Sequence, residues 1–251
     1  MKKITRKKHL EMRLQSIPSH PKPKVGLEQY TTPSIIASDL IWNAYSLDDI
    51  ENKNIIDLGC GTGIFAIGSA LMGASRSCGV DVDDDSISLA RDVSRKLSLA
   101  NADFIVSDID DFNEGFRPDT VFQNPPFGSQ KKADKGQDLK FVQKAIKLNP
   151  DVLYSFHMAS TEDFLIDYYG RNNLEITHIF RYNFPIPKIY DFHTKEKQIT
   201  DVIVIRAILW RFKFFLKLVF SNFHSKKQYI YIVDIIYFIL IYSLSIKKLV
   251  A

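Results

Sequence analysis

The residues best suited to chemistry form a glycine-rich loop directly after a short apolar run. Residues 57–63 read Asp-Leu-Gly-Cys-Gly-Thr-Gly. Glycine allows a sharp backbone turn and a close approach to a ligand, and the amide groups of a following helix would point at that ligand. The spacing of Gly59, Gly61 and Gly63 differs from the dinucleotide fingerprint, so the loop does not require a pyrophosphate.

An acidic residue stands at the end of each of the first three predicted strands: Asp57, Asp81 and Asp108. Asp81 follows the loop by about 20 residues, the distance at which a carboxylate can accept both hydrogens of a ribose diol. Asp108, with Ile109 beside it, is placed to face an adenine amine. Each acid alone would be an ordinary turn residue. Together with the glycine loop, they predict a pocket for a nucleoside that carries a sulfonium group.

A second candidate site consists of Asn124, Pro125, Pro126 and Phe127, which follow the apolar run 120–123. Proline has a fixed φ and no amide donor, so this segment is stiff and its carbonyl groups are free to accept hydrogen bonds. The Asn124 and Pro125 carbonyl oxygens could accept both hydrogens of a planar amine and localise its lone pair, while Phe127 stacks on the ring. Group transfer to such a nitrogen requires in-line positioning more than a strong base.

Alternating apolar and amphipathic runs predict the elements that position these residues. Strands are predicted at 54–58, 77–81, 102–106, 120–123, 152–156, 174–182 and 200–208. Helices are predicted at 2–14, 33–45, 63–72, 84–97, 140–148 and 161–169. The alternation indicates a mostly parallel seven-stranded sheet, with the last two strands paired as an antiparallel hairpin at one edge. The predicted fold is an α/β sandwich that binds ligands at the carboxyl ends of its strands.

The glycine loop resembles that of the class I S-adenosylmethionine-dependent methyltransferases, which have a Rossmann-like fold. Asn-Pro-Pro-Phe is shared by enzymes that methylate adenine N6, cytosine N4, guanine N2 or glutamine N5. Four segments resemble the methyltransferase-like-five family of ribosomal RNA adenine-N6 methyltransferases: KVGLEQYTTP at 24–33, DDIENK at 48–53, NPPFG at 124–128 and YDFH at 190–193. This likeness runs from about residue 1 to residue 208.

The resemblance implies which residues bind S-adenosylmethionine and which hold a flipped adenine. The implied cofactor residues are Gln29, Thr32, Gly59, Thr62, Ile64, Asp81, Asp108 and Ile109, to which the loop adds Asp57 and Gly61. Thr31 is a neighbouring candidate for the role of Thr32, because the chain is one residue shorter here than the family pattern. Residues 124–127 would hold the adenine. The family also implies a small zinc-binding activator protein that adds a strand at the 102–106 edge.

The formal net charge of +4 is an average over three unlike segments. Residues 1–24 form a basic arm with eight basic side chains and one acid, whereas the predicted methyltransferase domain at 25–208 has 18 basic and 27 acidic groups. RNA binding needs local positive charge, which the arm and the loops 130–135 and 188–197 can supply. A charged run is also the ordinary surface of a solvated helix. The arm lacks the apolar core of a signal peptide, which indicates a cytoplasmic protein.

Two cysteines, Cys60 and Cys78, are too few for a disulfide framework or a zinc site, and no metal site is predicted. Cys60 fits the loop as a small residue rather than as a nucleophile, and Cys78 is a core residue. His157 follows the fifth predicted strand, where it is either structural or catalytic.

The tail at 209–251 has a composition unlike the rest of the chain, with no glycine or proline. Its segment 229–246 has 18 residues with one charge, which barely reaches the length of a membrane span. The tail is either a membrane segment or a non-native extension. For the whole chain, the leading hypothesis is RNA adenine-N6 methylation. The alternatives are protein glutamine-N5 methylation and a non-catalytic, membrane-tethered binding module.

Overall fold

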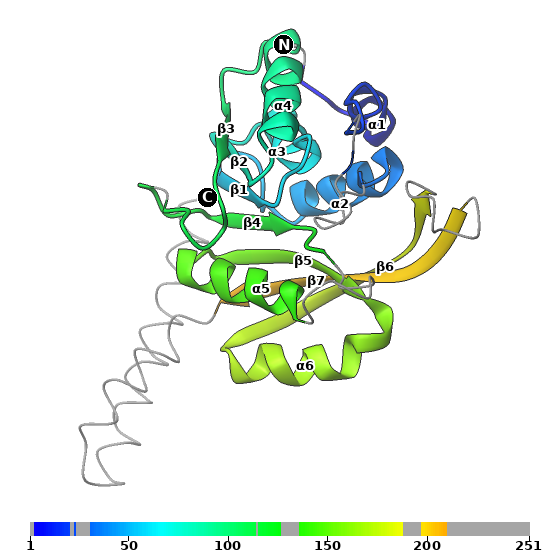
Figure 1. Cartoon of the computed structure of the whole chain (residues 1–251), viewed down its shortest axis with the longest axis vertical. Helices are drawn as coiled ribbons and strands as arrows, with labels where there is room; N and C mark the ends of the chain where they lie inside the picture. The colour runs from blue at the N-terminus through cyan, green and yellow to red at the C-terminus, as the bar shows by residue number, and fades with distance from the viewer. Residues whose placement is uncertain are drawn as a thin grey trace, which may run out of the picture. The chain divides into compact units, whose positions relative to one another are not determined.

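A seven-stranded sheet with the strand order β3-β2-β1-β4-β5-β7-β6 forms the centre of the molecule (Figure 1). The computed structural model describes residues 3–20, 23, 31–113, 115–126, 136–187 and 197–209. The strands β1 to β5 are parallel, and β7 is antiparallel to both of its neighbours. The predicted fold is therefore confirmed. The strands are β1 (Asn54–Leu58), β2 (Arg76–Asp81), β3 (Ala102–Val106), β4 (Thr120–Gln123), β5 (Val152–Met158), β6 (Leu174–Pro187) and β7 (Lys197–Leu209).

Helices cover both faces of this sheet, as Figure 1 shows. One buried apolar cluster joins the sheet to the first four helices, and a second joins its other face to the last two. Side chains alternate between faces along each strand, so Phe122 of β4 packs in the first cluster and Val121 in the second. The helices are α1 (Lys7–Leu14), α2 (Ser34–Ser46), α3 (Ile64–Leu71), α4 (Asp84–Lys96), α5 (Gln137–Leu148) and α6 (Glu162–Arg171).

The clearest difference from prediction is the length of the last two strands. β6 and β7 were expected to span 174–182 and 200–208, yet they remain paired out to Pro187 and Lys197. Pro185 and Pro187 argue against a strand from sequence alone, because proline cannot donate to a ladder. β6 lies at the edge of the sheet, where one side of the strand needs no partner, so the prolines are tolerated there.

The helical part of the basic arm packs against the rest of the protein. Leu10, Leu14 and Ile17 are buried in the first apolar cluster, against α2 and α3. Lys3 and Lys7 form ion pairs with Glu51 and Asp39, respectively. This part of the arm is therefore bound to the rest of the fold by apolar contacts as well as by charge.

The predicted tail falls almost entirely outside the described residues. β7 runs through Leu209, one residue past the predicted boundary, and residues 210–251, with the segment 229–246, are not described. Among the residues that are described, no helix is long and apolar enough to cross a membrane.

A buried ion pair ties the loop before β1 to β7. The Arg206 guanidinium donates from Nε and Nη2 to the two carboxylate oxygens of Asp49, at 2.8 and 2.9 Å. The Tyr154 hydroxyl of β5 donates to Asp49 Oδ2 at 2.5 Å. Arg206 and Asp49 are both buried, so each depends on the other to replace the water that it has lost.

Replacing Arg206 by alanine leaves the Asp49 carboxylate buried without its cation. We expect Arg206→Ala to lower the free energy of unfolding by about 3–5 kcal/mol, measured by urea denaturation. Arg181→Ala is the control, because Arg181 forms a similar two-bond pair with Glu162 on the surface. Equal losses of unfolding free energy in the two variants would show that the buried pair with Asp49 contributes no more to stability than the exposed pair.

Candidate active site

Asn124 follows β4 directly, at the carboxyl end of the sheet where the predicted sites converge. Its Nδ2 donates a 2.9 Å hydrogen bond to Oγ1 of Thr32, a buried residue just before α2. Asn124 Oδ1 is buried and has no hydrogen-bond partner among the described residues. A buried polar atom without a partner costs about 1–3 kcal/mol, so this oxygen is suited to accept a hydrogen from a bound ligand.

The glycine loop adopts backbone angles that only glycine accepts readily. Gly59, Gly61 and Gly63 have φ values of +67°, +52° and +86°. A Cβ at Gly59 would lie 2.9 Å from the Phe141 ring, and one at Gly63 would lie 2.7 Å from the Phe104 ring. Apart from its two chain neighbours, no described residue has a heavy atom within 4 Å of the Cβ position of Gly61, so the described part of the structure leaves the loop open there. The loop is therefore closely packed at its two ends and accessible in the middle.

Two carboxylates fix the shape of the loop. Asp57 Oδ2 accepts a 3.0 Å hydrogen bond from the amide of Ala66 in the first turn of α3. Asp81 Oδ2 accepts one of 2.8 Å from the amide of Gly61, while its Oδ1 accepts one of 2.9 Å from the amide of Asp83. Each Asp81 oxygen retains a lone pair for a further donor such as a ribose hydroxyl.

Burial raises the pKa of both carboxyl groups. Asp57 is 1% exposed, and the loss of water raises its pKa to about 7, against the opposing effect of the Ala66 hydrogen bond. The pKa of Asp81 is raised for the same reason and is lowered in part by its hydrogen bonds with the backbone amides of Asp83 and Gly61. The pKa of the Cys60 thiol is also raised by burial, which argues against a nucleophilic role.

The remaining predicted residues lie around the same end of the sheet. Thr62, Ile64, Ile109 and Pro125 are buried, Pro126 is half-buried, and Asp108 is exposed after β3, where its Oδ1 accepts a hydrogen bond from the amide of Asp110. Gln29 and Phe127 lie outside the described residues. His20 has no recognisable signal in the sequence. Its Nε2 lies 2.9 Å from Asp83 Oδ2 and joins the N-terminal segment to the start of α4. A carboxylate oxygen of Asp85 lies within 4.8 Å of the ligand atoms of His20 and Asp83.

Comparison with known proteins identifies the chain. A model described as the methyltransferase small domain matches residues 36–151. The uncharacterised protein MJ0284 of Methanocaldococcus jannaschii is 41% identical over 81% of this chain and 94% of that protein. The rRNA N(6)-adenosine-methyltransferase METTL5 of Danio rerio is 34% identical over 79% of this chain and 97% of that protein. The chain belongs to the methyltransferase-like-five family.

A solved structure agrees with this assignment. PH1948 of Pyrococcus horikoshii, a candidate RNA methyltransferase, matches with a TM-score of 0.74 and 36% identity, over 82% of this chain and 98% of that one. The described residues of this methyltransferase fit S-adenosylmethionine as cofactor. The described residues leave the backbone at Gly61 open, and Asp81, at the end of β2, keeps free lone pairs on oxygens beside this loop. These groups suit the close approach and the ribose diol of a nucleoside.

The raised pKa of Asp57 makes a prediction about stability. Its value in the unfolded chain is near 3.8 and its folded value is about 7, so the folded state holds a proton that the unfolded state has released between these values. Stability contributed by this group therefore falls as the pH rises through this window. Between pH 5 and pH 7, wild-type protein should lose on the order of 2 kcal/mol relative to Asp57→Asn, measured by urea denaturation. Parallel stability curves for the two proteins would contradict the assignment, and Asp163→Asn on exposed α6 is the matched control.

Proposed function

We propose that this chain methylates the N6 amine of an adenine in ribosomal RNA, and that the RNA is that of the small subunit. The observation that carries the proposal is the buried Oδ1 of Asn124 at the end of β4, which has no hydrogen-bond partner in the described part of the chain. Membership of a family with curated rRNA adenosine methyltransferases supports the same substrate class. S-Adenosylmethionine supplies the methyl group as an electrophilic sulfonium.

Different residues of the site would bind the adenine and orient its amine. Thr32 holds the amide of Asn124 through Nδ2, which aims Oδ1 away from Thr32 and toward a substrate amine. The Pro125 carbonyl is the acceptor for the second hydrogen of that amine. Two acceptors on one exocyclic nitrogen favour a localised lone pair, and holding that nitrogen in line with the methyl group accelerates transfer by positioning. Phe127 would stack on the base, which must first leave its helical stack.

Basic side chains on α1 support RNA as the substrate. Arg6, Lys8 and Arg13 are exposed, whereas Leu10 and Leu14 fix the helix to the domain. Because this basic surface is already fixed to the domain, it could neutralise RNA phosphate groups with little loss of conformational entropy.

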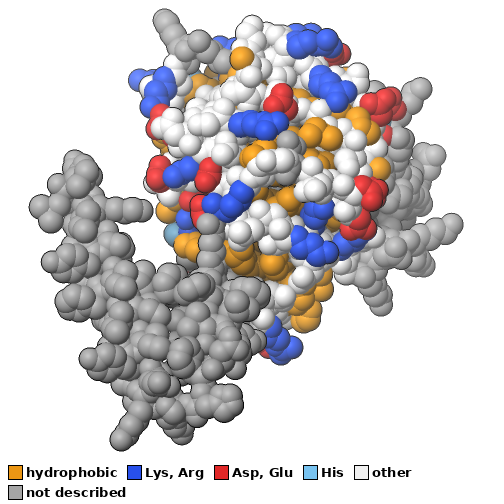
Figure 2. All heavy atoms as spheres, turned by 90° about the vertical axis from the view of Figure 1, so that its left-hand side faces the viewer, with side chains coloured by type: hydrophobic (Ala, Val, Ile, Leu, Met, Phe, Trp, Pro, Cys, Tyr) orange, Lys and Arg blue, Asp and Glu red, His pale blue; other side chains and the backbone are white. Residues whose placement is uncertain are grey.

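The position of β3 at the edge of the sheet supports the proposal that a protein partner adds a strand there. Among the described residues, β3 has a paired strand, β2, on one side only. Val106 is 42% exposed, and a groove of about 540 Å³ beside the strand is lined by residues that include Phe104 and Ile105. Figure 2 views the molecule from the side on which β3 lies in Figure 1 and shows hydrophobic side chains among Lys and Arg. A small zinc-binding activator would cover this edge through main-chain hydrogen bonds.

The catalytic role of Asn124 is tested by substitution. Asn124→Ala should reduce methyl transfer to small-subunit rRNA at least about 100-fold, because an acceptor aimed at the reacting nitrogen is lost. Transfer is measured with radiolabelled cofactor and by mass spectrometry of the nucleosides, and calorimetry should show cofactor affinity within about twofold of wild type.

Asn43→Ala, on α2, is the matched control and should remain active. Release factor offered in place of RNA tests glutamine-N5 methylation. Transfer to the release factor alone would replace the RNA proposal, and a chain that binds no cofactor would support the non-catalytic binding module.

The partner proposal is tested at the β3 edge. Val106→Pro removes an amide donor from the open side of this strand, because the neighbouring amide of Ser107 is the one that donates to Asp81 of β2. The substitution should abolish a one-to-one complex with the activator in size-exclusion chromatography. Ile199→Pro, at an exposed position of β7, is the control and should leave the complex intact. Retention of the complex by Val106→Pro would exclude strand addition at β3.

A further inference from the structure

A chain of hydrogen bonds runs through the sheet from β4 to the first turn of α5. Gln123 Nε2 donates to Ser155 Oγ at 2.8 Å, and Ser155 Oγ lies 2.8 Å from His157 Nε2. His157 Nδ1 lies 2.9 Å from Asp138 Oδ2. Gln123, Ser155 and His157 are completely buried, and Asp138 is the acidic residue of the first turn of α5.

The partners assign a direction to this chain. A carboxylate only accepts hydrogen bonds, so Nδ1 of His157 carries the hydrogen that Asp138 accepts. In the tautomer with its hydrogen on Nδ1, Nε2 is an acceptor, and the hydroxyls of Ser155 and Tyr169 are the donors within reach of it. Ser155 Oγ still accepts from the amide of Gln123. The Ser155 hydroxyl and both ring nitrogens of His157 therefore each have a hydrogen-bond partner within 3.0 Å, which restricts their geometry.

The order Ser155, His157, Asp138 is that of a nucleophilic triad, but burial excludes that chemistry. Ser155 and His157 are both 0% exposed, so a substrate has no access to the hydroxyl. The Tyr169 hydroxyl, from α6, lies 3.0 Å from His157 Nε2 and closes the site from the helix side. The group is therefore a structural unit of the sheet and its α5–α6 layer.

The two ends of the chain flank the proposed catalytic segment. Gln123 immediately precedes Asn124, and Asp138 lies at the start of the helix that follows the motif. Both ends are bound to β5, through Ser155 and His157. We propose that Gln123, Ser155, His157 and Asp138 are positioning residues that hold the end of β4 and the first turn of α5 against β5, and so set the orientation of the Asn124 amide for methyl transfer.

The test uses Asp138, because its side chain is partly exposed and its loss leaves no cavity in the core. Asp138→Ala should lower kcat for RNA methylation about 10- to 100-fold, the scale of a small misplacement of reacting groups. The KM for RNA and the Kd for S-adenosylmethionine should change by less than about threefold, since positioning and not binding is lost. Asp138→Asn retains an acceptor oxygen for Nδ1–H and should restore most of kcat.

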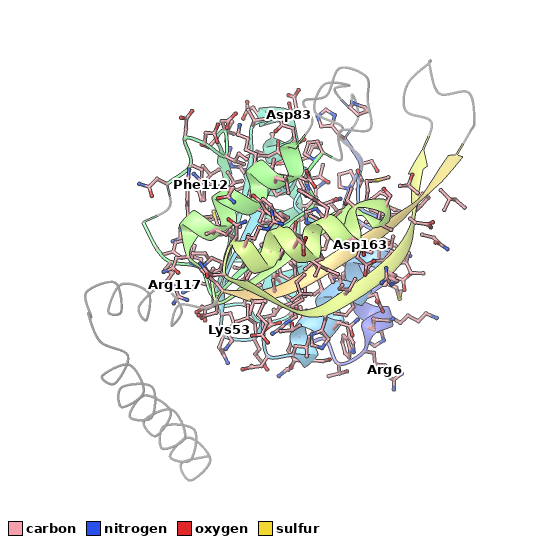
Figure 3. The ribbon with its side chains drawn as sticks, turned by 90° about the horizontal axis from the view of Figure 1, so that it is seen from below. Arg6, Lys53, Asp83, Phe112, Arg117 and Asp163 are labelled. Atoms are coloured by element: carbon pink, nitrogen blue, oxygen red, sulfur yellow. The ribbon has the colours of Figure 1, made fainter. Side chains whose placement is uncertain are left out.

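Asp163→Ala is the matched control, because Asp163 is an exposed acid in the first turn of the neighbouring helix α6 (Figure 3). Rates are expressed per cofactor-binding site, so that partial unfolding does not count as a lower kcat. Ser155→Ala, which removes the link at the other end, should give the same kcat loss if the chain acts as a unit.

An unchanged kcat in Asp138→Ala and Ser155→Ala would overturn the positioning role. An equal loss in Asp138→Asn and Asp138→Ala would also overturn it, as would a loss that disappears when rates are expressed per binding site. The inference rests on the proposed methyl transfer to RNA. An inactive wild-type protein would refute that proposed function, whereas an active wild type with fully active Asp138 and Ser155 variants would refute only the positioning role.

Discussion

The attachment of the glycine loop to β2 is the constraint on which the site depends. The amides of Gly59 and Cys60 both donate to the Val80 carbonyl, and the amide of Gly61 donates to Asp81. These bonds are formed only when β1 and β2 are adjacent, parallel and in register, because loop and carboxylate then meet at one edge of the sheet. The same loop leads into α3, whose first turn is held by Asp57. The cofactor pocket and the start of α3 therefore both depend on the same pairing of β1 with β2.

Much of this arrangement is predictable from local patterns. The bounds of β1, β3 and β4 agree with prediction to the residue, since short apolar runs bounded by polar turns are unambiguous. The long β6–β7 hairpin was underestimated, because prolines that end an interior strand are acceptable at an edge. α5 begins three residues earlier than predicted, since its first turn is polar and lacks an apolar periodicity.

Some residues of the candidate site can also be predicted from the sequence, and others cannot. Loop glycines and strand-end acids have recognisable spacings, so most of the cofactor residues could be nominated from sequence. Contacts between distant segments have no such signal: Thr32 and Asn124 are 92 residues apart, and Asp49 and Arg206 are 157 apart. The role of His157 was equally open, because neither Asp138 nor Tyr169 can be identified as its neighbour until the helices are packed. β5 therefore carries buried polar groups on both faces, each satisfied from elsewhere in the chain.

The two edges of the sheet differ in a way that bears on stoichiometry. β6 has prolines at 185 and 187 and an irregular register between Ile176 and His178, all features that blunt an edge. β3 is short and regular, and it has neither a proline nor an irregular register. Edge pairing can therefore extend the sheet in one direction only. Two copies joined through β3 would form a closed dimer without further growth, and a different protein at β3 would compete with that dimer for the same strand.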